Sequence, residues 1–249
     1  MTYETDWVQS YVQNGILTIT LNRADKQNAL TNAMYMKMVD IMQSGDASEL
    51  VKLIILEGDG PNFTAGNDIA DFLATDKPIA EVGAVVWLNC LAQMSKPVIA
   101  KVRGNAVGVG TTCLLHCDLV YADNTAKFSM PFSQLGLCPE AGVSLLLPRL
   151  VGHQRASELL LLGKRFYAND ALEMGILNQV TEPEQLDDIV SEVANQLVDL
   201  PQESVMLTKQ LLKTEPESVL ERMRREFALF EKQLHSDTAK AIFEQFLNR

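Results

Sequence analysis

An apolar strand followed by a glycine-rich turn, Val98–Val102 (VIAKV) and then Gly104–Gly110 (GNAVGVG), decides how this 249-residue chain is expected to fold. The same arrangement occurs earlier, where Lys52–Glu57 (KLIILE) precedes Asn62–Asp68 (NFTAGND). A turn that contains glycine can point backbone N–H groups outward, and a helix that begins there adds its positive end. Each turn alone is more simply interpreted as an ordinary tight turn. Two that face each other could form an oxyanion hole.

The segments around these two runs predict alternating strands and helices. The expected strands are 7–12, 16–21, 52–57, 98–102, 118–122 and 127–130, and the expected helices are 31–45, 79–94, 154–162 and 169–174. Thr31 is expected to cap the first helix and Gly45 to end it. From Gln154 onward the pattern is nearly all helical, and no strand is expected after Asn178–Val180. The alternation indicates an α/β layered domain.

Pro201 is the candidate boundary between a core of residues 1–200 and a helical region of residues 201–249. The chain is long enough for one large domain, or for one domain with a small appendage. The first ten residues do not form a signal-peptide pattern. We therefore expect a cytoplasmic protein.

Composition excludes several classes of partner. The net charge of -11 argues against nonspecific binding to nucleic acid or to an anionic membrane. The apolar runs are too short to span a bilayer. The four cysteines are expected to be reduced core thiols, and three widely separated histidines support neither a metal site nor a histidine-based triad. The second glycine turn lacks the dinucleotide-binding spacing, and no P-loop occurs.

Several longer motifs occur in order along the chain. They are LNRADKQNAL from Leu21, FTAGNDI from Phe63, VRGNAVGVG from Val102, CDLVYA from Cys117, PFSQLGL from Pro131 and ASELLLLGKRFYANDALEMGIL from Ala156. Through these blocks the chain resembles the crotonase (enoyl-CoA hydratase/isomerase) superfamily, from about Ile16 to Val180. The resemblance implies an α/β fold built as a spiral of ββα units with a helical C-terminal region, assembled as a homotrimer or a dimer of trimers.

The resemblance also implies a substrate and a set of site residues. The substrate would be an acyl-CoA thioester, with coenzyme A as part of the substrate and no separate cofactor. The backbone N–H groups of Asn67 and Val109 would form the oxyanion hole, with valine at 109 in place of the family's usual glycine. The candidates for CoA binding are Arg23, Lys26, Ala65, Asp68 and Ile69. Asp68 is also interpreted as a helix cap.

Two departures from the family pattern bear on the reaction. Family hydratases use two glutamates to activate water, and their positions map onto Thr112 and Phe132. Neither is a carboxylate, so hydratase activity is not expected. Glu140, in LGLCPEAG, occupies the position where some family isomerases place a single catalytic carboxylate. The surrounding block is similar to that of peroxisomal-type 3-enoyl-CoA to 2-enoyl-CoA isomerases.

Glu140 is therefore the predicted proton shuttle, which would take a proton from C2 and return it to C4. Pro139 and Glu140 are expected in the first turn of a helix, where the dipole favours the anion, while apolar neighbours favour the neutral acid. Residues of the acyl pocket could include Phe72, Leu73, Trp87 and Leu88. The alternatives are another crotonase-type reaction, such as thioester hydrolysis or decarboxylation, or a noncatalytic acyl-CoA-binding module.

Overall fold

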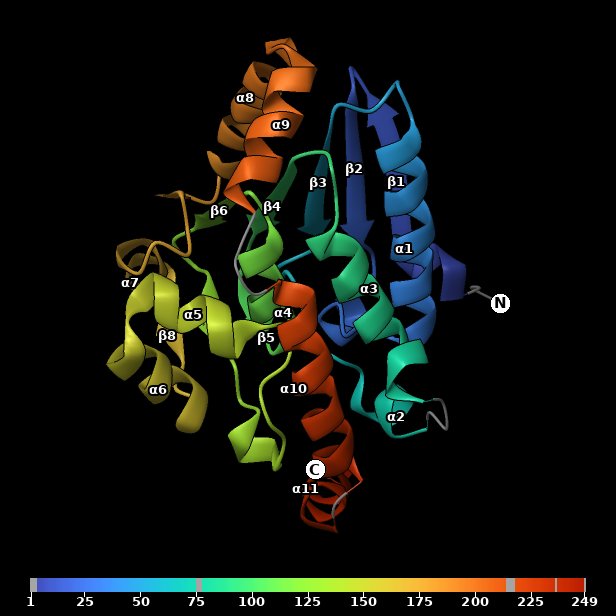
Figure 1. Ribbon diagram of the computed structural model, residues 1–249, viewed down its shortest axis with the longest axis vertical. Helices are drawn as coiled ribbons and strands as arrows, with labels where there is room; N and C mark the ends of the chain where they lie inside the picture. The colour runs from blue at the N-terminus through green and yellow to red at the C-terminus, as the bar shows by residue number, and fades with distance from the viewer. Residues whose placement is uncertain (1–3, 75–77, 214–217, 236, 249) are drawn as a thin grey trace.

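The computed structural model describes residues 4–74, 78–213, 218–235 and 237–248, and it has the predicted α/β architecture. One sheet has six strands in the order β1-β2-β3-β4-β6-β9, and a second has three strands in the order β5-β7-β8 (Figure 1). The strands of the large sheet are Val8–Gln13, Ile16–Leu21, Leu53–Gly58, Val98–Val102, Leu119–Asp123 and Gln179–Thr181. Those of the small sheet are Asn105–Val107, Lys127–Ser129 and Phe166–Tyr167.

Eleven α-helices occur in the described ranges. They are α1 (Asn32–Ala47), α2 (Ile69–Leu73), α3 (Gly83–Ala92), α4 (Val109–Thr112), α5 (Val143–Val151), α6 (His153–Leu161), α7 (Ala168–Glu173), α8 (Leu186–Asp199), α9 (Gln202–Leu212), α10 (Val219–Leu234) and α11 (Asp237–Leu247). None of these helices combines the length and apolarity that crossing a bilayer would require.

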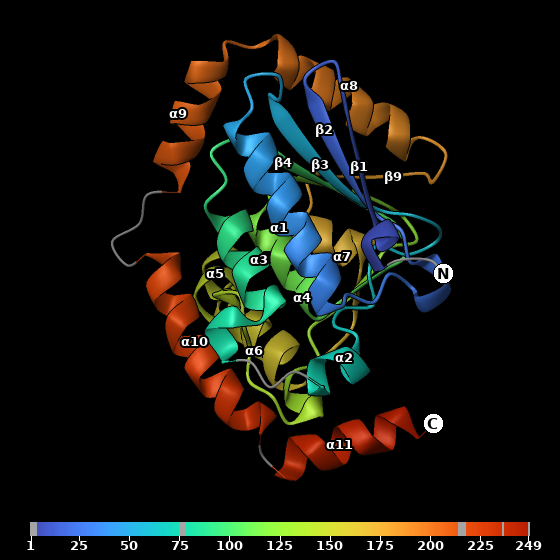
Figure 2. The same cartoon turned by 90° about the vertical axis from the view of Figure 1, so that its right-hand side faces the viewer.

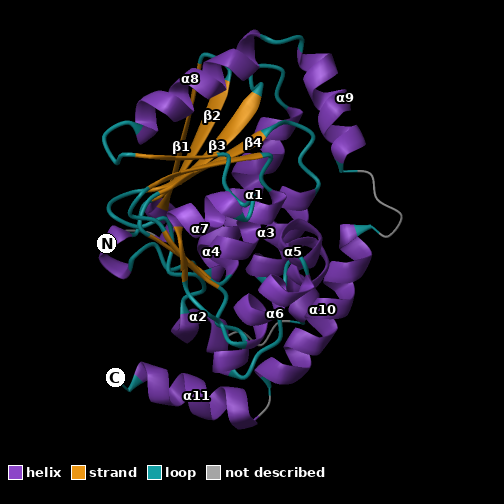
Figure 3. Cartoon of the chain, turned by 90° about the vertical axis from the view of Figure 1, so that its left-hand side faces the viewer, coloured by secondary structure: helices purple, strands orange, loops and turns teal. Residues whose placement is uncertain are grey.

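The central strands of the large sheet are buried on both faces, which explains the continuous apolar run of β3. Leu53 and Ile55 pack toward α8 in a small core, whereas Ile54 and Leu56 face the main core on the other side. Side chains alternate across a strand, so a parallel strand covered on both faces needs apolar residues at every position. Figure 3 shows α8 over one face of the orange strands and α1 on the opposite side.

The local signals at the N-terminal end are confirmed. Asn14 and Gly15 both adopt positive φ in the turn that joins β1 to β2, as a two-residue hairpin turn requires. The hydroxyl of Thr31 accepts a hydrogen bond from the N–H of Met34 and caps α1. The first sheet segment and the first helix therefore begin where the sequence predicts.

The predicted end of the first helix was wrong. Gly45 does not end α1, which continues to Ala47. At position 45 a Cβ atom would lie 2.3 Å from Cδ2 of Leu17, so this glycine serves helix-to-sheet packing. The region after Gln154 is nearly all helical, as predicted, and it also contains the two-residue strand β8, which was not expected and pairs antiparallel with β7.

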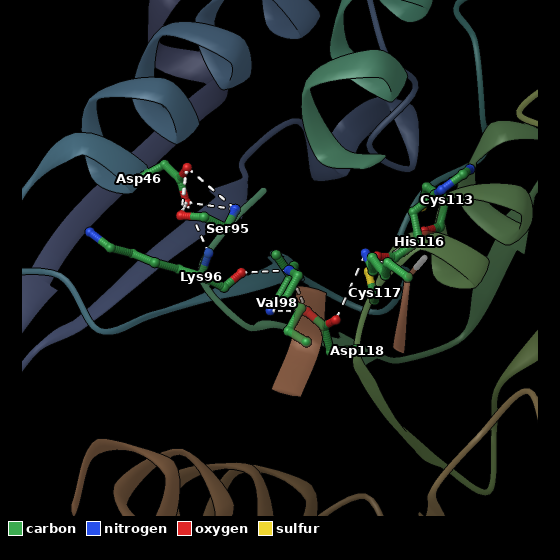
Figure 4. Close-up of polar contacts among 10 residues, drawn as sticks. Asp46, Ser95, Lys96, Val98, Cys113, His116, Cys117 and Asp118 are labelled. Atoms are coloured by element: carbon green, nitrogen blue, oxygen red, sulfur yellow. Dashed lines mark hydrogen bonds and ion pairs between the residues drawn. The ribbon is translucent and has the colours of Figure 1, made fainter. Parts of the chain in front are cut away.

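The C-terminal helices lie along the outside of the core. Figure 2 shows α9, α10 and α11 in succession down one side and across the lower end, where α11 lies near α2. Lys209 of α9 is buried and donates to the carbonyl oxygen of Lys96 at 2.6 Å and to Asp118 at 2.7 Å. Asp118 also accepts from the N–H of Val98 (Figure 4). Through Lys209, α9 is therefore attached at the start of β4. The domain boundary at residue 201 stays a prediction.

Candidate active site

The two glycine-rich turns lie side by side, held by a short parallel ladder. The N–H of Thr64 donates to the carbonyl oxygen of Asn105 at 2.9 Å, and the N–H of Val107 donates to that of Thr64 at 3.0 Å. Each turn follows a strand of the large sheet, β3 and β4, and these strands are parallel neighbours. The sheet therefore delivers both turns to the same edge, as the strand pattern implies.

Glycine allows the close approach of the two turns. Gly66 has a φ of 88°, and a Cβ atom there would lie 2.6 Å from the carbonyl oxygen of Val107. A Cβ atom at Gly110 would lie 2.4 Å from Cγ2 of Thr64. Both distances are shorter than a carbon atom permits, so these two positions require glycine at this separation of the backbones.

Asn67 and Val109 present backbone N–H groups that bond to no other group in the described ranges. Val109 is the first residue of α4 and follows Gly108, whose φ of 57° and ψ of -118° turn the chain into the helix. Asn67 follows Gly66 in the other turn. Both residues line one cavity of about 500 Å³. The structure thus brings together the two donors that the resemblance predicts.

The cavity wall is mostly apolar and comes from the middle of the chain and from the C-terminal helices α10 and α11. It contains the phenylalanines Phe72, Phe132, Phe230, Phe243 and Phe246. Among the described lining residues, none carries a charge. Phe72 and Phe230 pack edge to face with their ring centroids 5.6 Å apart. An acyl group in this cavity would therefore meet aromatic faces and edges rather than ionic groups.

Only part of this wall was predicted. Phe72 lines the cavity, but Trp87 and Leu88 lie in the main core, and Leu73 packs at its edge. Phe230 of α10 and Phe243 of α11 were missed, because their distance along the chain hides their nearness to the glycine turns. Their one local signal is that both are buried apolar positions on amphipathic helices.

Glu140 is buried next to α4, with 5% of its surface exposed. Its Oε1 atom accepts a hydrogen bond of 2.6 Å from the hydroxyl of Thr112. Thr112 is three residues from Val109 on α4, about one helical turn, so the carboxylate lies one turn behind the second N–H donor. Glu140 itself does not line the cavity in the described structure.

The prediction that Glu140 belongs to a helix first turn was wrong. Helix α5 begins at Val143, and Ala141 and Gly142 adopt positive φ of 56° and 68° between them. This tight turn separates Glu140 from the first residue of α5, so Glu140 lies outside the helix. One oxygen of the carboxylate, Oε1, accepts from the side-chain hydroxyl of Thr112 on α4.

His116 contacts the turn at Ala141 and Gly142 through its imidazole ring. Its Nε2 atom lies 2.8 Å from the carbonyl oxygen of Ala141, and its own carbonyl oxygen accepts from Nζ of Lys213 at 2.9 Å. Burial lowers the pKa of His116 to about 4, against the opposing effect of the Ala141 hydrogen bond, and the charge of Lys213 lowers it further. The imidazole is therefore neutral at pH 7, with Nε2 as the donor to Ala141.

This histidine gives a testable pH dependence of stability. The pKa of His116 is about 4 in the folded chain against 6.5 for an unperturbed histidine, so the unfolded chain takes up the proton first as the pH falls. The stability contribution is complete above pH 6.5 and is lost as the pH falls toward 4, by roughly 3 kcal/mol. We expect the free energy of unfolding of His116→Gln, measured in urea, to fall less steeply over this pH range than that of the wild type. The exposed His153→Gln variant should keep the wild-type slope; equal slopes for His116→Gln and wild type would contradict the prediction.

The predicted CoA-binding residues divide into two groups. Asp68 caps α2 by accepting from the N–H groups of Ala70 and Asp71, and it pairs with Arg23 at 2.7 Å. The guanidinium of Arg23 also lies over the ring of Trp7, 4.4 Å from its centroid. Burial raises the pKa of Asp68, but the hydrogen bond from Arg23, the backbone N–H groups of Asp71 and Ala70 and the charge of Arg23 together lower it below its usual value. Arg23 and Asp68 thus support the turn.

The remaining three candidates are Lys26, Ala65 and Ile69. Lys26 is exposed on the segment before α1. Ala65 donates its N–H to the carbonyl oxygen of Gln27 at 2.9 Å, which ties this segment to the first glycine turn. Ala65 and Ile69 line the cavity. The CoA-binding role of all five residues stays a prediction.

Fold and cavity together define an α/β protein of the crotonase class. The chain matches the enoyl-CoA hydratase/isomerase family over residues 11–249. It is 34% identical over 223 residues to 1,2-epoxyphenylacetyl-CoA isomerase of Escherichia coli K12, covering 87% of this chain and 85% of the relative. It is 31% identical to enoyl-CoA delta isomerase 2 of Rattus norvegicus, covering 86% of this chain and 56% of the relative.

Solved structures agree with this assignment. The chain superimposes on the structure of Pseudomonas aeruginosa OdaA with a TM-score of 0.94 and 37% identity, over 98% of this chain and all of that one (100%). An enoyl-CoA hydratase/isomerase from Pseudoalteromonas atlantica T6c gives a TM-score of 0.92 and 34% identity, with 97% of each chain covered. The chain belongs to the enoyl-CoA hydratase/isomerase family.

Proposed function

We propose that this protein isomerises a 3-enoyl-CoA to the 2-enoyl-CoA, with Glu140 as the single proton shuttle. The observation that carries this proposal is the Thr112–Glu140 pair. Thr112 stands where a family hydratase would have its first glutamate, and here it is a hydroxyl that holds Glu140. Phe132 stands at the second hydratase position and lines the cavity. The arrangement supports chemistry by one carboxylate without an activated water.

The proposed mechanism has two parts, an oxyanion hole and a proton shuttle. The thioester oxygen accepts hydrogen bonds from the N–H groups of Asn67 and Val109, which stabilise the dienolate that forms when C2 loses its proton. The carboxylate of Glu140 takes that proton and returns it to C4, so the base is regenerated within one cycle. In the proposal, Glu140 turns from its Thr112 hydrogen bond toward the cavity when it reacts.

The rest of the ligand extends the same proposal. The adenosine phosphates of CoA would lie near Lys26, next to the hydrogen bond between Ala65 and Gln27. Lys26 would supply a local positive charge on a chain whose net charge is negative. The acyl group would be uncharged, because the described lining of the cavity is aromatic and aliphatic. Assembly as a homotrimer or a dimer of trimers follows from the family and is part of the proposal.

Two absorbance assays test this function against the hydratase alternative. Isomerisation of a 3-enoyl-CoA creates a conjugated enoyl thioester, so its ultraviolet absorbance should rise with added enzyme. Hydration of crotonyl-CoA would remove that conjugation, and we expect no measurable loss because neither hydratase glutamate is present. Rapid loss of the crotonyl-CoA signal, or no gain with 3-enoyl-CoA of several chain lengths, would contradict the proposal. Binding without any turnover would favour the noncatalytic module.

A further inference from the structure

The side chain of Asn67 is held by a buried tyrosine from α1. The hydroxyl of Tyr35 donates to Oδ1 of Asn67 at 2.5 Å. Tyr35 is only 2% exposed, and its ring packs against that of Trp87 with the centroids 5.5 Å apart. Because the ring is enclosed on the core side, the hydroxyl is held at one place beside the first glycine turn.

The backbone on both sides of Asn67 is attached to the same segment as Tyr35. The N–H of Leu30 donates to the carbonyl oxygen of Gly66, and the N–H of Asp68 donates to that of Leu30, each at 2.8 Å. Leu30 lies just before α1, which carries Tyr35. The start of α1 therefore fixes both the main chain and the side chain of Asn67.

The other end of the Asn67 amide remains available. An asparagine amide has one acceptor oxygen and one nitrogen with two N–H donors. Oδ1 accepts from Tyr35, while Nδ2 bonds to no other group in the described part of the chain. The residue lines the cavity, and Nδ2 is not among the buried nitrogen atoms that lack a partner. Nδ2 is therefore not fully buried, which leaves it able to donate to a bound molecule.

We infer that Tyr35 is a positioning residue that orients the Asn67 amide, so that Nδ2 donates a hydrogen bond to the thioester group of bound acyl-CoA. This inference rests on the proposed function, since it adds a side-chain donor beside the backbone N–H of the same residue. Without the tyrosine hydroxyl, the amide can rotate and present Oδ1 to the cavity. An acceptor at that place would repel the negative oxygen that forms in the reaction.

The chemistry of Tyr35 suits this role over a wide pH range. Burial raises the pKa of Tyr35 well above its usual value, and the nearby Glu140 raises it further, followed by Cys113 and Asp71. The hydroxyl therefore stays protonated at any pH at which the protein works. In the structure this hydroxyl donates to Oδ1 of Asn67, whereas a phenolate could only accept and would favour the amide turned the other way, so the protonated form is the one that supports the observed orientation.

Binding measurements with two matched ligands test the inference without requiring turnover. One ligand is an acyl-CoA thioester, and the other is the corresponding thioether, which lacks the carbonyl oxygen. In a Glu140→Gln background, calorimetry should show that Tyr35→Phe raises the Kd of the thioester about tenfold and leaves that of the thioether unchanged. Tyr121→Phe is the matched control, because Tyr121 is buried under α8 on the opposite face of the sheet. It should change neither Kd.

A double-variant cycle separates positioning from a general packing role. Asn67→Ala keeps the backbone N–H but removes the amide, and it should weaken thioester binding about as much as Tyr35→Phe does. In the Asn67→Ala background, Tyr35→Phe should have no further effect. Equal weakening of both ligands, or additive losses in the double variant, would overturn the inference. If the selective loss occurs in a protein that isomerises no 3-enoyl-CoA, the proposed reaction fails while the inference stands.

Discussion

Replacing Glu140 with glutamine is expected to lower kcat for a 3-enoyl-CoA by about a thousandfold and to leave acyl-CoA binding within about twofold. Glutamine has nearly the same shape, and its Oε1 can still accept the hydrogen bond from Thr112. What it loses is the ability to take a proton from C2 and return it to C4. The fall should therefore occur in kcat rather than in KM. Stopped-flow absorbance of the conjugated product measures the rate.

The location of Glu140 makes this variant decisive. None of the described residues lining the cavity carries a carboxylate, and Glu140 lies one helical turn behind the Val109 N–H. Glu158→Gln is a suitable control, since that carboxylate is exposed and pairs with Lys164. It should keep wild-type kcat. If Glu140→Gln retains a third or more of wild-type activity, another group moves the proton and the single-carboxylate mechanism is wrong.

The fold could be predicted closely where its signals are local. Strands β2 and β4 agree with the predicted ranges to the residue, because each is a β-branched run bounded by turn residues. Strand β8 could not be found in this way, since it has two residues and exists only through its pairing with β7. The end of α1 was misplaced because Gly45 resembles a helix stop. Its actual role is contact with Leu17 of a strand distant in sequence.

The candidate site likewise contains residues that could be predicted from local motifs and residues that could not. Asn67 and Val109 could be placed from motif resemblance, and the structure brings both to one cavity. Tyr35 could not, because on α1 it reads as one more buried core residue, and its partner Asn67 lies 32 positions away. The aromatic wall from α10 and α11 was hidden for the same reason. Contacts between distant segments leave no pattern in either segment alone.

Gly108→Ala is expected to lower kcat about a hundredfold, by moving a backbone donor without changing any side chain that contacts substrate. Gly108 has φ 57° and ψ -118°, a conformation that favours glycine, although a Cβ atom there would meet no other atom within 4 Å. Alanine would therefore act on the protein through backbone strain, on the order of 1–3 kcal/mol, and not through a clash with a neighbouring residue. Relief of that strain rotates the next peptide, which carries the Val109 N–H. Loss of one such donor lowers kcat by about 10²–10³.

Gly152→Ala is the matched control for this variant. Gly152 also has a positive φ, 81°, and a Cβ atom there would likewise meet nothing within 4 Å, but it joins α5 to α6 and does not line the cavity. Both variants should lose similar amounts of stability in urea unfolding, because the same kind of strain is introduced. Only Gly108→Ala should lose activity, with little change in KM. If both variants keep wild-type kcat despite equal destabilisation, the Val109 N–H does not stabilise the reacting oxygen, and the donor must be sought elsewhere along the cavity wall.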